Sequence, residues 1–150
     1  MPPRSVRGRL TLLAVIGAGG AIGTSARYGT ALAIPPRSGA YPVATFLVNV
    51  AGAVILGAVA ELPAGSLPVH ELSRPALGTG FCGGLTTFST MSLEIYLLLP
   101  GQPEVAAAYA AASLAAAPAC AWAGVALVRT GRTVRRARRA PRVPPERNKR

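Results

Sequence analysis

Four long apolar segments constrain the fold of this chain more than any other feature. Each has about 20 residues or more, which is enough for a helix to cross a hydrocarbon core of roughly 30 Å. Apart from Arg27 and Glu94 they hold no Asp, Glu, Lys or Arg, so none has a polar face to place in water. The chain is therefore predicted to be an all-α membrane protein with four transmembrane helices. The segments cover residues 10–34, 41–60, 75–99 and 105–128.

Little of the chain lies outside these segments, and most of it is basic. Residues 1–9 form a basic N-terminal segment, residues 10–128 the four-helix transmembrane domain, and residues 129–150 a basic tail. The tail contains ten Lys or Arg and one acid. Because its three prolines interrupt helical hydrogen bonding, we expect a disordered tail rather than one continuous helix.

The basic residues predict the orientation of the chain. With four crossings, both termini and the middle connection lie on the same side of the membrane. That side carries three N-terminal arginines, Arg74 and the ten basic tail residues, against Arg37 and the nearby Arg27 on the other side. Basic residues close to span ends are retained in the cytoplasm. We expect a multi-pass protein of the cell (inner) membrane with cytoplasmic N and C termini, and we do not expect nucleic acid as a partner.

The third segment is unusual for a transmembrane helix. Its stretch GFCGGLTTFSTMSLE, residues 80–94, holds three glycines and five hydroxyl side chains. Hydroxyls compete with helical hydrogen bonds, and Gly83 and Gly84 remove two successive side chains, so we predict a broken helix near mid-membrane. Carbonyl groups released by a break must be buried in protein or satisfied by water or an ion. Their oxygens are suitable ligands for a hard cation.

Phe88 and Asn49 are candidates for contact with an anion. Phe88 lies beside the predicted break, and the edge of an aromatic ring is weakly positive; taken alone, a packing role is the simpler interpretation. Asn49 shares a helix face with Thr45 and is costly in lipid, so it must face protein or water. An interhelical hydrogen bond also explains Asn49.

The two charges inside the segments allow two interpretations each. Arg27 is either an interfacial arginine whose guanidinium reaches the membrane surface or a charge in a pore vestibule. Glu94 is either a capping or interhelical partner or a proton site of a coupled transporter.

Three motifs together resemble the Fluc/CrcB fluoride channels. They are GAGGAIGTSARY in the first segment, TFLVNVAG in the second and GGLTTFSTMSLE in the third. The likeness covers about residues 10–128 and excludes the tail. It implies a fluoride-specific channel, not an enzyme, that exports fluoride passively and protects the cell from its toxicity. It also implies a dimer of two chains inserted in opposite directions.

The resemblance assigns roles to individual residues. It implies a structural sodium ion at the dimer centre, held by backbone carbonyls of Gly83 and Thr86 from each chain. Arg27 matches an arginine of the pore vestibule. Met91 stands where a second pore phenylalanine is expected. The other residues expected at the fluoride pore are Asn49, Phe88, Ser89, Thr90, Thr45, Tyr109 and Ser113.

The charge bias complicates this antiparallel assembly. Two identical chains that both insert with a cytoplasmic N terminus cannot pair in opposite directions. We therefore predict a heterodimer with a homologous channel subunit of opposite charge bias, which also supplies the aromatic that Met91 replaces. A homodimer remains the alternative if the tail has little effect on insertion.

Two other function classes fit a small four-span chain. A proton-coupled multidrug exporter needs an acid in its first span, where this chain has only Arg27. A non-transporting membrane protein could bind nucleic acid or ribosomes through its arginine tail. Deletion of residues 132–150 separates the second class from a channel, which should still pass fluoride.

Overall fold

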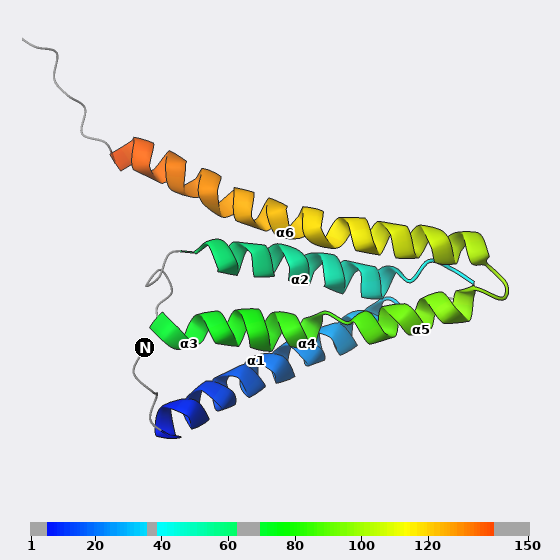
Figure 1. Cartoon of the computed structure of the whole chain (residues 1–150), viewed down its shortest axis with the longest axis horizontal. Coiled ribbons are helices and arrows are strands. Elements are labelled where there is room, and N and C mark those ends of the chain that lie inside the picture. The colour runs from blue at the N-terminus through cyan, green and yellow to red at the C-terminus, as the bar shows by residue number, and fades with distance from the viewer. Residues whose placement is uncertain (1–5, 36–38, 63–69, 140–150) are drawn as a thin grey trace, which may run out of the picture.

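The computed structural model describes residues 6–35, 39–62 and 70–139, which form an all-α structure. The first helix, the second helix, the run of short helices that follows and the last helix alternate in direction, so the beginning of α1 and the end of α6 lie at the same end of the molecule (Figure 1). The long helices are α1 (Val6–Ala33), α2 (Val43–Glu61) and α6 (Pro103–Arg139). Between α2 and α6 lie four shorter pieces, α3 (His70–Pro75), the π-helical η1 (Ala76–Cys82), α4 (Gly83–Leu85) and α5 (Phe88–Leu98).

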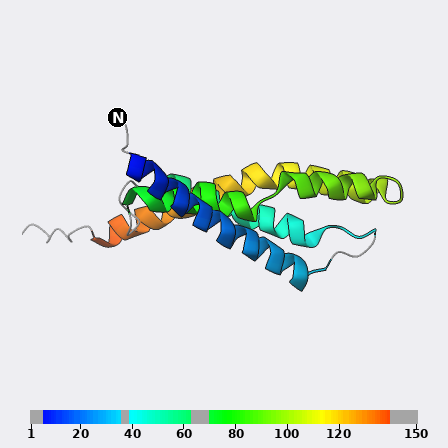
Figure 2. The same cartoon turned by 90° about the horizontal axis from the view of Figure 1, so that it is seen from below.

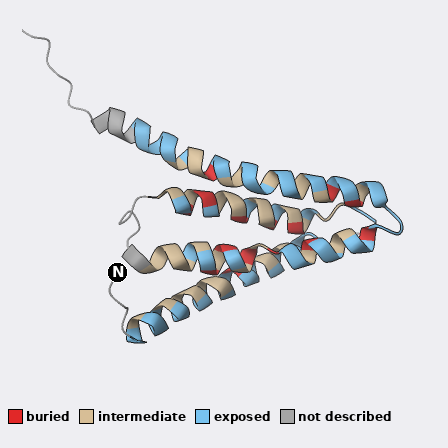
Figure 3. Cartoon of the chain, viewed as in Figure 1, coloured by how far each residue is buried: buried red, intermediate tan, exposed pale blue. Residues whose placement is uncertain are grey.

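Three helices are long and apolar enough to cross a membrane: α1, α2 and α6 as far as Val134. The fourth predicted crossing is the interrupted run from α3 to α5, which no single helix covers. The prediction of an all-α multi-pass membrane protein with a broken third span is therefore confirmed. Exposed residues dominate the outer faces and buried residues lie between the helices (Figure 3), as expected where the outer face contacts lipid.

Glycines allow α1 and the third segment to pack backbone against backbone. A Cβ on Gly19 or Gly23 would clash with a carbonyl of η1, and a Cβ on Gly80 of η1 would clash with the carbonyl of Ile16. Seen from below, α1 crosses the third segment at an angle (Figure 2). Small residues at such crossings permit the close contact that stabilises helix pairs in membranes.

A second close contact joins α2 to α6. A Cβ on Gly57 would clash with the carbonyl of Ala121, and a Cβ on Gly124 would clash with that of Val54. The fold thus contains two tightly packed helix pairs, and the third segment lies between α1 and α2 (Figure 1).

The end of the last helix differs from the prediction. We expected helix to end at Val128 and a disordered tail to begin at residue 129, but α6 continues to Arg139. Ala and Arg are strong helix formers, and the prolines that interrupt helix come after this point in the sequence. Residues 140–150 lie outside the described residues. So do Arg4 and Arg37, two of the arginines used to predict the orientation of the chain.

Candidate functional site

The third segment is interrupted at Thr86 and Thr87, which both have extended backbones. The Thr86 hydroxyl donates to the carbonyl of Cys82 (2.9 Å), one turn back. The Thr87 hydroxyl accepts a hydrogen bond from the N–H of Thr90 (3.2 Å), which is the usual N-cap arrangement at the start of a helix. The two threonines therefore end one helix and start the next.

The paired glycines have a different role from the one we expected. Gly83 and Gly84 are helical, in α4. A Cβ on Gly84 would clash with the carbonyl of Gly20 in α1, whereas a Cβ on Gly83 meets nothing within 4 Å. Gly84 thus permits close packing on α1, and the position of the break is set by the threonines.

The Asn49 side chain binds both backbone polar groups of one residue at the break, Thr87. Its Nδ2 donates to the carbonyl of Thr87 (3.1 Å), and its Oδ1 accepts from the N–H of Thr87 (2.8 Å). The amide therefore replaces the hydrogen bond that the Thr87 N–H would make in a continuous helix, and it adds a second donor to the Thr87 carbonyl, which also begins α5. Asn49 therefore makes interhelical hydrogen bonds. Its side-chain NH2 group has two N–H donors, so one of them is left for another acceptor.

The same hydrogen bonds release two carbonyls. In a continuous α-helix the N–H of Thr87 would bond the carbonyl of Gly83, and that of Thr90 would bond the carbonyl of Thr86. Here both N–H groups donate to side chains instead, to Asn49 and to Thr87. The two carbonyls predicted to hold sodium are thus two that the break deprives of their helical partners.

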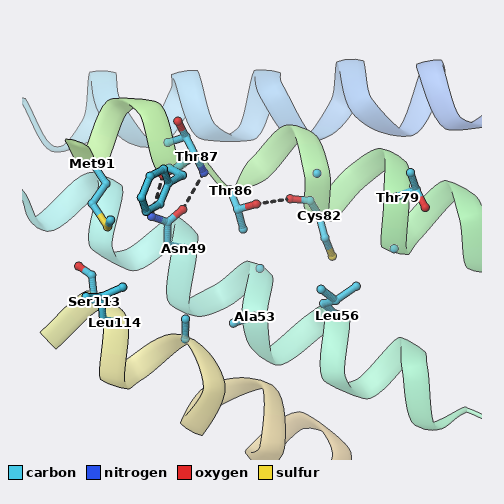
Figure 4. Close-up of a pocket in the computed structure, with 15 residues that line it drawn as sticks. Asn49, Ala53, Leu56, Thr79, Cys82, Thr86, Thr87, Met91, Ser113 and Leu114 are labelled. Atoms are coloured by element: carbon cyan, nitrogen blue, oxygen red, sulfur yellow. Dashed lines mark hydrogen bonds between the residues drawn. The ribbon is translucent and has the colours of Figure 1, made fainter. Parts of the chain in front are cut away.

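A cavity of about 560 Å³ opens beside the break, between α2, the third segment and α6. Asn49, Thr86, Met91 and Ser113 line it (Figure 4), and Phe88 and Gly83 lie at its wall. The Met91 side chain is buried, whereas Phe88 is 72% exposed. The hydroxyl oxygen of Ser113 is buried and has no hydrogen-bond partner within the described part of the chain.

The remaining predicted pore residues lie elsewhere. A smaller cavity of about 240 Å³ is lined by Arg27, Thr45 and Thr90, and only Thr87 borders both cavities. Ser89 is exposed, with its Oγ 3.3 Å from the Thr87 hydroxyl. The single chain therefore divides most of the predicted residues between two cavities, and Ser89 and Tyr109 line neither of them.

A carboxylate cluster joins α2, α5 and α6 near the break. Glu94 accepts hydrogen bonds from the hydroxyls of Thr45 (2.6 Å) and Tyr109 (2.7 Å). Tyr109 is fully buried, and its ring meets the edge of Tyr41 at 5.1 Å. Glu94, Thr45 and Tyr109 were each singled out from the sequence, but their contact with one another was not predicted. The available signal was an acid within an apolar span, which needs donors from neighbouring helices.

Comparison with known proteins identifies the family. Residues 14–125 match the model of the CrcB-like protein, Camphor Resistance (CrcB) family. The chain belongs to the CrcB family. It is 44% identical over 108 residues to fluoride-specific ion channel FluC 2 of Streptomyces avermitilis, and the matched residues cover 71% of this chain and 68% of the relative.

Other CrcB relatives give the same result. The chain is 41% identical over 116 residues to fluoride-specific ion channel FluC of Chlorobaculum tepidum, covering 77% of this chain and 92% of the relative. It is 47% identical over 104 residues to fluoride-specific ion channel FluC 1 of Mycobacterium tuberculosis, covering 68% and 78%. The match to the CrcB model ends before the basic part of α6, at residue 125.

Proposed function

We propose that this CrcB protein is a subunit of a fluoride-specific ion channel that exports fluoride passively and protects the cell from its toxicity. The observation that carries the proposal is the break in the third segment, held open by Asn49 beside a cavity, in a chain whose relatives are named fluoride-specific ion channels. Membership of this family favours a channel over an enzyme and over a proton-coupled exporter.

The lining of the larger cavity suits a small anion. Fluoride binds water tightly, so removing its water in an apolar channel is very costly unless hydrogen bonds replace it. Asn49 and the unpaired hydroxyl of Ser113 are two donors that line it. The edge of Phe88 adds a weak positive field. These groups bind moderately, which is what conduction requires.

We also propose that a structural sodium ion binds the carbonyls of Gly83 and Thr86. Carbonyl oxygens suit a hard cation, and both groups lack their helical donors. Gly83 is exposed, so a second subunit could add its own pair of oxygens. When bound, the ion would supply a fixed positive charge that favours anions nearby.

The partner we propose is a homologous chain inserted in the opposite direction. The exposed Phe88 and Gly83 support an interface at the third segment. The shared end of the described α1 and α6 supports termini on one side, and the basic residues favour the cytoplasm. A reporter fused to the C terminus tests this: mixed orientation in cells that lack a homologue would favour the homodimer.

The channel itself is tested by fluoride efflux from liposomes. We expect reconstituted protein, alone or with a co-expressed homologue, to release fluoride and to retain chloride, as measured with ion-selective electrodes. A Tyr96→Phe variant serves as control, because Tyr96 is exposed and does not line either cavity. Absence of fluoride release from well-folded protein in both preparations would refute the function.

A further inference from the structure

A second charged site lies at the end of α2, away from the break. Glu61, the last residue of α2, pairs with Arg129 (3.1 Å) and Arg132 (3.7 Å) of α6. Arg74, in α3, donates through Nη2 to the carbonyls of Val59, Ala60 and Leu62 at 2.7–3.2 Å. Two guanidinium groups thus share one carboxylate, which leaves this group of three side chains net positive.

Arg129 and Arg132 keep most of their hydrogen-bonding capacity for another ligand. Their side chains are 67% and 48% exposed. A guanidinium has five N–H donors, and Glu61 contacts one nitrogen of each. The two arginines are three residues apart and therefore lie on neighbouring positions of one helix face. Glu61 holds them together, so an anion that binds both loses little additional side-chain freedom.

The apolar surface beside this cluster continues along α6. Trp122 precedes Arg129 by seven residues, so it lies two helical turns away on the same face, at a distance of about 10.5 Å along the axis. Trp122 is 71% exposed. The first arginine comes directly after Val128, where the apolar part of α6 ends. This face of α6 is therefore apolar at Trp122 and cationic at Arg129. One lipid could contact both, with its acyl chain at the first and its headgroup at the second.

We propose that Arg129 and Arg132 bind the headgroup phosphate of an anionic phospholipid, whose acyl chain lies against Trp122. Guanidinium groups bind phosphate oxygens in bidentate fashion, and basic residues at the membrane surface attract anionic lipid. The exposed Trp122 below the arginines favours a lipid over a free phosphate ion, because only a lipid covers both. The site goes beyond the fluoride pathway and requires only that the chain lies in a membrane.

Trp122 is the only tryptophan in the chain, so it reports on this site directly. We would reconstitute the full chain in phosphatidylcholine nanodiscs and titrate phosphatidylglycerol that carries brominated acyl chains, measuring the quenching of tryptophan fluorescence. Brominated phosphatidylcholine gives the reference. We expect phosphatidylglycerol to quench at a lower mole fraction, and millimolar inorganic phosphate not to reverse this quenching.

Charge variants make the experiment specific. Removal of two basic residues lowers binding to an anionic surface by up to about 30-fold, and we expect about tenfold for R129Q/R132Q because Glu61 opposes part of their charge. R129K/R132K keeps the charge and loses the bidentate geometry, so we expect a smaller loss. R7Q/R9Q removes the same charge from the start of α1 and should leave the quenching unchanged.

Several outcomes would overturn the proposal. They are equal quenching by the two lipids in the unaltered protein, an equal loss in R7Q/R9Q, an unchanged response in R129K/R132K, or reversal by inorganic phosphate. Circular dichroism of each variant confirms that α-helix is retained before its quenching is compared.

Discussion

Replacement of Asn49 by Ala tests the role of its amide at the break. The variant loses hydrogen bonds of 2.8 and 3.1 Å and leaves the N–H of Thr87 without a partner. The carbonyl of Thr87, the N-cap residue of α5, keeps the first hydrogen bond of that helix. An unpaired buried polar group costs about 1–3 kcal/mol. Because Thr87 is buried, we expect N49A to lower the free energy of unfolding by about 1–3 kcal/mol.

A neighbouring variant provides the control. Thr86→Val also removes a hydrogen bond at the break, but the carbonyl of Cys82 that it leaves still accepts from the Thr86 N–H (3.0 Å). We therefore expect T86V to change stability by less than about 1 kcal/mol. Reversible unfolding in mixed micelles, followed by circular dichroism, measures both. Equal stability of N49A and T86V would refute the view that Asn49 holds the break in place.

The same reasoning gives three further predictions. Gly124→Ala should destabilise the protein by about 1–3 kcal/mol because its Cβ would clash with the Val54 carbonyl. The control Gly131→Ala, whose Cβ meets nothing within 4 Å, should be neutral or slightly stabilising in the same unfolding measurement. Equal effects of the two variants would contradict the close packing of α2 on α6. Tyr109→Phe removes one of the two donors to Glu94 and should cost about 1–3 kcal/mol, measured against the exposed Tyr96→Phe as control. Ser113→Ala should leave stability unchanged or raise it, because the hydroxyl is buried and unpaired. The same variant should slow fluoride efflux about tenfold if one hydrogen bond of about 1.4 kcal/mol to the ion is lost. Unaltered efflux would place Ser113 outside the fluoride route.

The sequence predicted the elements that depend on local composition. Apolar length identified the crossings, and the hydroxyl-rich stretch identified the interrupted one. The predicted cause combined the hydroxyls with Gly83 and Gly84; the backbone becomes extended at Thr86 and Thr87, whereas the two glycines are helical. The reason lies in contacts between helices. Asn49 of α2 stabilises the extended conformation, and Gly84 must be small because it packs against α1.

The candidate site was predicted residue by residue but not as an arrangement. Sequence spacing relates Thr45 to Asn49 on one helix, yet their side chains serve different partners, Glu94 and Thr87. The contact of Glu94 with Tyr109 depends on how α5 packs on α6, which no local pattern encodes. The extension of α6 to Arg139 was missed because the prolines beyond it were given more weight than the helix-forming residues before them.

The central claim is that the break directs carbonyls of the third segment toward a cation. Its most direct test is an experimental structure of the assembled channel, prepared with a heavier monovalent cation in place of sodium and measured by anomalous scattering. We expect one anomalous peak between the subunits, next to the carbonyls of Gly83 and Thr86. A continuous third helix, or a resolved break with no peak beside these carbonyls, would contradict the account.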